Sequence, residues 1–192
     1  MPEPYEILTG VGRLYIATPG TTFPDVDDTP PATWRDLGVT QDGISVKLDE
    51  KVNEVYVDQE TAPLKASRSE ETLVIEATLA EATLENLADV LGQSVTDTPA
   101  ASGVAGTRKS RLYRGGVVKT FAFLFRGFSA YGEYPAQYEL PYGYISGSVE
   151  LKQAKDDNQK IKIEIHALLD PLASTDEDKF GHLVMQDAAA LP

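Results

Sequence analysis

The stretch ISVKLDEKVNEVYVDQETAPLKASRSEETLVIEATLAEATLENLADVLG, residues 44–92, starts and ends with patterns that are typical of a folded core. Ile44, Val46 and Leu48 alternate with polar residues, which predicts a strand with one buried face. Residues 73–79 alternate in the same way and predict a second strand. Two half-buried strands therefore flank a middle section of different character.

That middle section, residues 49–71, is rich in charge and holds few large apolar side chains. A connection of this length is uncommon inside a compact domain and indicates either function or disorder. We therefore predict a long surface loop. Val55 and Val57 resume the alternation one residue out of phase, which predicts a bulge or loop between Asp49 and Glu54.

An amphipathic helix is predicted over about residues 79–91. Thr78 and Glu81 have the spacing of a capping box, and Gly92 supplies the C-terminal stop. Apolar residues recur between them at helical spacing, opposite a polar row. The face expected to pack on the core consists of Leu84, Leu87 and Leu91.

The other apolar segments read as strands. Residues 11–17, 144–152 and 159–169 each show an apolar pattern of strand length, and KDDN at 155–158 predicts a hairpin turn between the last two. Residues 117–128 are apolar on nearly both faces, which predicts a central strand. Because the strands do not alternate with helices, the predicted fold class is mainly β, an antiparallel β-sandwich or barrel with one flanking α-helix.

The domain organisation follows from this count. A chain of 192 residues with 42% hydrophobic residues suits one domain, placed at 11–169, with arms at 1–10 and 170–192.

The absence of cysteine excludes disulfides and thiolate sites. No apolar run approaches the ~20 residues needed to span a bilayer. The N-terminus lacks the basic and apolar regions of a signal peptide, so we expect folding in a cytoplasm.

The net charge of −13 is concentrated in the first half of the chain. Residues 1–100 carry 6 Lys/Arg and 19 Asp/Glu, whereas residues 101–192 carry 11 of each. Solubility is one explanation, and a surface that must not adhere to a polyanion is another. Nucleic-acid binding through a basic stripe is poorly supported by this balance.

No catalytic constellation is visible, so we predict no enzyme activity, catalytic residue, metal or cofactor. His166 and His182 are predicted to be solvated. The acidic cluster at residues 25–28 lacks the spaced oxygens, glycine and terminal Glu of a calcium loop.

Two further clusters are candidates for contact with a partner. A short basic cluster, expected to face water or a neighbour's acidic surface, comprises Arg108, Lys109, Arg111 and Arg114. A tyrosine-rich segment at 131–144, predicted to be a loop, comprises Tyr131, Tyr134, Tyr138, Tyr142 and Tyr144. Packing is its default role, and an interface is the second.

The order of these features resembles the major tail tube proteins of long, non-contractile-tailed bacteriophages. The resemblance covers roughly residues 11–169 and rests on order and texture, without an invariant signature. The stretches that carry it are GVGRLYIA, WRDLG (34–38), VDQETAPLKA (57–66), TLVIEATLAEAT, TLENLADVLG and the later hairpin YISGSVELKQ…KIKIEIHALLD.

The resemblance implies a structural virion protein with a β-sandwich and a flanking helix. Six copies would close a ring by joining their sheets into an inner β-barrel, and rings would stack into a tube through which DNA passes without specific binding. The implied partners are other copies of the chain, a tape measure protein and tail-end proteins. The implied location is the virion tail, after assembly in the host cytoplasm.

The resemblance also assigns expected roles to residues. The 49–71 loop would reach the adjacent ring, and its candidates are Glu50, Lys51, Asn53, Glu54, Tyr56, Asp58, Glu60, Lys65 and Arg68. The polar strand faces would line the lumen, and their candidates are Ser45, Lys47, Asp49, Thr72, Glu76, Ser146, Ser148 and Glu150, with Lys162 and Glu164 as additions. The alternative function is a carbohydrate-binding or adhesin-like β-sandwich that uses the tyrosine-rich segment.

Overall fold

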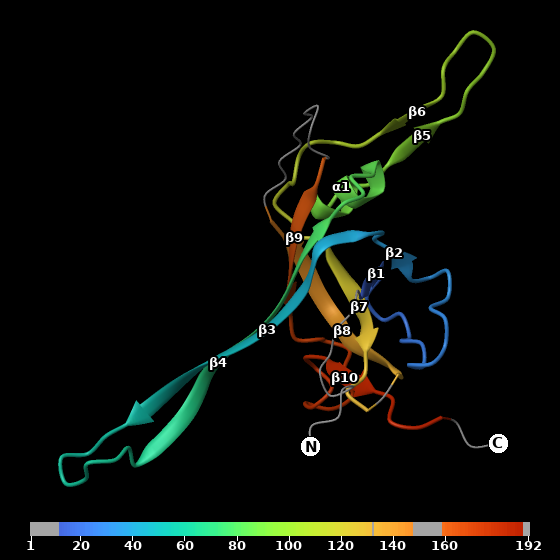
Figure 1. The fold of residues 1–192 in the computed structure, drawn as a ribbon. Coiled ribbons are helices and arrows are strands. Elements are labelled where there is room, and N and C mark those ends of the chain that lie inside the picture. Colours follow the sequence, from blue (N-terminus) through green and yellow to red (C-terminus); the bar gives the residue numbers. More distant parts are fainter. Residues whose placement is uncertain (1–11, 132, 148–158, 190–192) are drawn as a thin grey trace.

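The computed structural model describes residues 12–131, 133–147 and 159–189 (Figure 1). Within these ranges it contains one helix, α1 (Leu84–Val90), and ten strands. The strands are β1 (Arg13–Ala17), β2 (Arg35–Asp36), β3 (Thr40–Val55), β4 (Lys65–Leu79), β5 (Thr96–Thr98), β6 (Thr107–Lys109), β7 (Thr120–Phe128), β8 (Pro135–Ser146), β9 (Ile161–Ala167) and β10 (His182–Met185). The predicted mainly β, antiparallel fold with a single flanking helix is confirmed.

The large sheet has the strand order β2-β1-β7-β8-β9-β4-β3, and every pairing is antiparallel. β8 is long enough to take two partners on one edge: its first half pairs with β10 and its last four residues pair with β9. β5 and β6 form a separate two-stranded sheet that projects beyond α1 (Figure 1).

One hydrophobic core lies on the inner face of the large sheet. Leu14 of β1, Phe123 of β7 and Ile163 of β9 are fully buried in it, together with Ile75 of β4. Because strands from opposite ends of the sheet contribute to one cluster, the sheet curves around its own core. Ile44 and Val46 also pack against the cluster.

β7 is buried on both faces, as a central strand should be. Phe121 and Phe123 face the main core, while Ala122 and Leu124 pack with Trp34 in a second cluster on the outer face. Trp34 is held there by a hydrogen bond of 3.0 Å from its Nε1 to the carbonyl of Thr22. The predicted start of this strand at residue 117 is wrong, because the strand begins at Thr120.

The helix is shorter than predicted and begins elsewhere. Its N-cap is Thr83, whose hydroxyl accepts a hydrogen bond from the Asn86 amide, so the cap predicted at Thr78 is wrong. Thr78 instead continues β4, because it pairs with Lys162 of β9. The predicted stop at Gly92 has the positive φ of 67° that a C-terminal glycine adopts, and the amides of Gly92 and Gln93 satisfy the last carbonyls.

The predicted face of the helix packs against the core, but it is not buried along its whole length. Leu87 is buried as predicted, but Leu84 and Leu91 are only partly buried against the core. Asn86 is buried instead: its Nδ2 donates to the carbonyl of Leu37 (2.9 Å), and its Oδ1 accepts from Arg35 (2.7 Å). This polar link ties β2 and the following turn to α1, which residue spacing alone could not indicate.

Some expectations fall outside the described residues: the N-terminal arm at 1–10, the turn at 155–158, and the strand positions from residue 148 to 152. The C-terminal segment predicted as an arm contains β10, which adds to the large sheet through Leu183↔Tyr138 and its neighbours. A four-residue strand is too short to show a period in the sequence.

We predict that Ile163→Ala lowers the free energy of unfolding by about 2–5 kcal/mol, since it leaves a cavity between β4, β8 and β9. Val117→Ala is the matched control, because Val117 is 86% exposed and should change stability by less than ~0.5 kcal/mol. Urea unfolding of the dispersed protein measures both. Equal losses for the two variants would show that the core is misplaced.

Candidate assembly surfaces

The segment predicted as a loop at 49–71 is mostly a paired hairpin. β3 and β4 pair from Thr40↔Leu79 outward to Val55↔Lys65, so only residues 56–64 lie outside the strands. The prediction failed because a strand that is solvated on both faces shows no apolar alternation, while its backbone still pairs. We call residues 49–71 the arm.

The arm projects away from the rest of the molecule (Figure 1). Residues 49–55 alone extend β3 by roughly 20 Å at ordinary strand rise. The predicted irregularity between Asp49 and Glu54 is a β-bulge: the register steps from Lys51↔Glu70 to Val52↔Arg68. Ser69 is the extra residue, and its hydroxyl donates to the carbonyl of Lys51 (3.1 Å).

The inter-ring candidates lie in three parts of the arm. Those on β3 are Glu50, Lys51, Asn53 and Glu54; those on β4 are Lys65 and Arg68; those at the tip are Tyr56, Asp58 and Glu60. Two ion pairs cross the strands, Glu50–Arg68 (2.5 Å) and Lys51–Glu70 (3.6 Å). The hydrogen bond to Glu50 raises the pKa of Arg68. Exposed pairs of this kind stabilise weakly, so the arm contributes little to the stability of the domain.

The arm also exposes apolar side chains. Leu48 at its base is 65% exposed because β3 has run past the core, and Leu64 near the tip is 69% exposed. Val52, Val55 and Tyr56 are exposed as well. Single exposed hydrophobic residues are ordinary, but four on the arm, with Leu48 directly before it, are typical of a surface that a partner covers.

The outer edge of β3 lacks a partner strand within the described ranges. The other edge strands, β2 and β10, have two and four residues, whereas β3 has sixteen. A long unpaired edge presents a row of free amide and carbonyl groups that can pair with another chain.

The polar faces of four adjacent strands form one continuous surface. Ser45 of β3, Glu76 of β4, Glu164 of β9 and Ser146 of β8 stand in one cross-strand row. The parallel row is Lys47, Val74, His166 and Tyr144, and Asp49 faces Thr72 beyond it. The structure thus brings six lumen candidates and the added pair Lys162 and Glu164 onto one surface, which we call the polar face, while Ser148 and Glu150 lie outside the described residues.

Charges on the polar face are nearly balanced. Lys47 Nζ lies 2.5 Å from Glu76 Oε1, and Glu164 lies 3.9 Å from Lys162 and 3.8 Å from His166. The hydrogen bond from Lys47 lowers the pKa of Glu76 and raises the pKa of Lys47. The acidic excess of the chain therefore does not accumulate on this surface.

The described residues hold no group of three or more His, Asp or Glu side chains placed to bind a metal. The acidic cluster at 25–28 instead contributes backbone carbonyl groups, because Arg126 donates to the carbonyls of Asp25 (2.6 Å) and Asp28.

No helix within the described ranges is long and apolar enough to cross a membrane.

The tyrosine-rich segment is mostly strand, so the predicted loop is wrong. Residues 135–146 form β8, where Tyr138 stacks on Phe125 (5.4 Å between ring centroids) and Tyr144 stacks on His166 (5.2 Å). Aromatic side chains that alternate along a strand pack on their cross-strand neighbours. Two of the five tyrosines therefore stack on neighbouring strands, whereas Tyr131 is 59% exposed.

The basic cluster is divided between internal ion pairs and free cations. Arg108 pairs with Glu85 and with Asp97 (2.8 Å), and Arg114 Nη2 donates to the carbonyl of Gly147 (2.6 Å). Lys109 and Arg111 have no ion-pair partner among the described residues.

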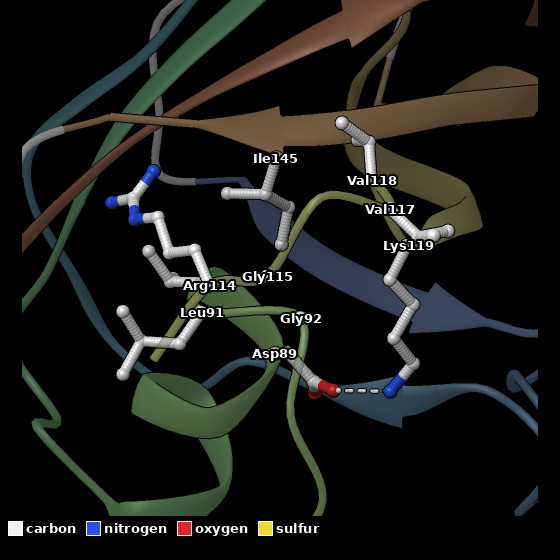
Figure 2. A pocket seen from close by; sticks show the side chains of 10 residues that line it. Asp89, Leu91, Gly92, Arg114, Gly115, Val117, Val118, Lys119 and Ile145 are labelled. Carbon is white, nitrogen blue, oxygen red and sulfur yellow. Dashed lines mark hydrogen bonds and ion pairs between the residues drawn. The ribbon is translucent and has the colours of Figure 1, made fainter. Parts of the chain in front are cut away.

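Beside this cluster, residues 89–92 at the end of α1 and residues 114–119 enclose an open pocket of about 170 Å³ (Figure 2). Val117, Val118 and Leu91 supply apolar walls, while Arg114 and Lys119 carry charge at its border. Sequence reasoning missed this pocket because Val117 and Val118 looked like the start of a core strand. Their position after two glycines, which favour a turn, is the signal that could have placed them outside it.

Comparison with known proteins adds one match. The model of a protein family described as "Phage tail tube protein" matches residues 4–187, a range that includes every strand and the helix of the structure. No curated protein matches the chain.

We predict a specific acid dependence for the Lys47–Glu76 pair. Because the folded-state pKa of Glu76 is lowered, its contribution to stability is fully present above the unfolded pKa and is lost as pH falls through the folded pKa. Glu76→Gln should therefore cost stability near neutral pH and cost nothing once the pH is below the lowered pKa of Glu76, where the carboxyl is protonated in both states. Urea midpoints between pH 2 and 7 measure this loss.

Lys47→Met provides the control background for this test. Without the lysine, Glu76→Gln should leave the pH dependence nearly unchanged, since the hydrogen bond that lowers the pKa is absent. The same acid-side loss in both backgrounds would assign the pKa shift to another neighbour.

Proposed function

The chain belongs to the phage tail tube protein family, whose members are structural, non-enzymatic virion proteins, and from this premise we propose that it assembles as stacked hexameric rings that form the tube of a long, non-contractile tail. Phage DNA passes through the lumen without specific binding. The chain is part of the virion tail, and assembly takes place in the host cytoplasm with a tape measure protein and tail-end proteins as partners.

The observation that carries this proposal is the outer edge of β3, which no other described strand covers. A strand of sixteen residues with a free edge invites aggregation unless another strand covers it. Pairing with a neighbouring copy satisfies its backbone groups, and closing the ring removes the remaining edges. The number six comes from the resemblance to major tail tube proteins.

Stacking of the rings is assigned to the arm. The arm extends beyond the core, exposes apolar side chains and is held by weak, solvated ion pairs. A hairpin of this kind is marginally stable on its own, so contact with the adjacent ring orders it. The long surface loop of the sequence prediction is thus replaced by a marginally stable strand pair, which contact with the next ring stabilises.

The lumen is assigned to the polar face. Its side chains stand opposite the core on β3, β4, β9 and β8, as required if these strands form the inner barrel. Duplex DNA carries one negative charge per ~1.7 Å, so a strongly basic wall would hold it at each step. The near balance of charge on the polar face leaves DNA free to slide.

We predict that replacing residues 51–70 with Asn-Gly leaves a folded domain that no longer stacks. Glu50 and Glu71 are a cross-strand pair, so a two-residue turn can close the shortened hairpin. The unfolding free energy should fall by less than ~1 kcal/mol, since the arm buries little. Electron microscopy of the concentrated protein should show single rings for the variant and tubes for the wild type.

Two results would contradict this account. Long tubes formed by the shortened protein would place the stacking contact elsewhere. Wild-type protein and native particles without any rings or tubes would remove the proposed function itself.

We predict that the reversals Asp49→Lys and Glu164→Lys slow DNA ejection while tubes still form. Both groups are solvated on the polar face, and each reversal would repeat around every ring and attract phosphate. The rate of genome ejection in vitro, followed across a salt series, should fall most at low salt. The matched control is Asp176→Lys with Glu177→Lys, the same charge change on the C-terminal surface. Wild-type ejection at all salts would show that the polar face does not line the DNA path.

A further inference from the structure

We propose that the basic, apolar surface beside α1 receives the tip of the arm from a second copy of this chain. This receiving surface consists of residues 108–119 and the pocket between them and the C-terminal end of α1. The inference rests on the proposed function, in which the arm reaches an adjacent ring, and it identifies the surface on which the arm docks.

Charge complementarity selects the occupant. Residues 108–119 carry five Lys or Arg and no Asp or Glu, whereas residues 54–64 carry Glu54, Asp58 and Glu60 and no Lys or Arg. Within the receiving surface, internal ion pairs occupy Arg108 and Lys119. Lys109, Arg111 and Arg114 remain without a carboxylate partner among the described residues. Three cations are therefore available for Asp58 and Glu60 at the tip and for Glu54 at the end of β3.

Apolar groups match as well. Val117 is 86% exposed and Val118 63%, although both lie at a pocket wall rather than on a free loop tip. The arm offers Tyr56 and Leu64, both more than half exposed. A pocket of about 170 Å³ accommodates a side chain of the size of leucine or tyrosine. Burial of Val117 and Val118 against it would add hydrophobic stabilisation to the ion pairs.

The two surfaces occupy opposite ends of the molecule. The tip of the arm lies at one extreme of Figure 1, and α1 with the β5–β6 hairpin lies toward the other. One chain therefore cannot dock its own arm in its own pocket. A contact between two different surfaces at opposite ends is heterologous, and repetition of such a contact produces an open stack.

A charge swap tests this contact. Lys109→Glu with Arg111→Glu, or Asp58→Lys with Glu60→Lys, should each raise the concentration needed for stacking at least about tenfold at low salt, because like charges then face one another. The four substitutions together should restore stacking to nearly the wild-type level. Sedimentation and electron microscopy count rings and tubes, and urea unfolding checks that each variant is folded.

A crosslink provides an independent readout. The chain has no cysteine, so Leu64→Cys with Val118→Cys introduces the only thiols. A disulfide requires Cα atoms closer than about 7 Å, so oxidised tubes should yield a ladder of linked chains only if the tip lies in the pocket. Leu64→Cys with Leu172→Cys is the control, since Leu172 is exposed outside the receiving surface.

The outcomes separate the two levels of the account. Three results would overturn the docking contact in a protein whose wild type forms tubes: normal stacking of both double variants, no rescue by the fourfold variant, or no ladder from the Leu64–Val118 pair. Each of them would leave the proposed tube intact. Loss of duplex DNA binding by the Lys109 and Arg111 variant, with stacking unchanged, would assign the cluster to DNA. Failure of the wild-type chain to form any assembly would contradict the proposed function.

Discussion

The antiparallel ladder between β3 and β4 continues from the core to the far end of the molecule, and most other features depend on it. Its inner part places Ile44, Val46 and Ile75 on the core, and the same backbone alternation sends Ser45, Lys47 and Glu76 to the opposite surface. Its outer part has no core to cover. The same two strands therefore contribute to the hydrophobic core, carry part of the polar face and form the arm.

This arrangement separates stability from assembly. The core residues of β4, β7 and β9 stabilise the domain by burial. The arm buries little and is held by its backbone ladder and by exposed ion pairs whose contribution is small. In the assembly that we propose, substitutions in the arm therefore change how copies associate while the domain remains folded. A tail tube protein needs this separation, since it must fold first and then form many identical contacts.

The sequence predicted the parts of the fold in which burial creates a period. β9 alternates strictly because Ile161, Ile163 and Ile165 face the core, and β7 is apolar on both faces because Trp34 covers its outer side. The arm was misread because solvated strands have no apolar period, and β10 because four residues are too few. The pocket at Val117 and Val118 depends on how α1 packs near residues 114–119, which sequence spacing does not specify.

The sequence placed the candidate residues of the polar face through the polar–apolar alternation of the strands, and the resemblance to tail tube proteins suggested their role. The pairing register of β3, β4, β9 and β8 brings these residues onto one surface. The outer edge of β3 has no partner among the described strands, and we propose that another copy covers it. Amide hydrogen exchange of β3, compared between dispersed protein and tubes, tests it most directly. We predict that the outward-facing amides of β3 exchange rapidly in the dispersed protein and become protected in tubes. Equal exchange rates in the two states would show that β3 remains an open edge and that rings close through another surface.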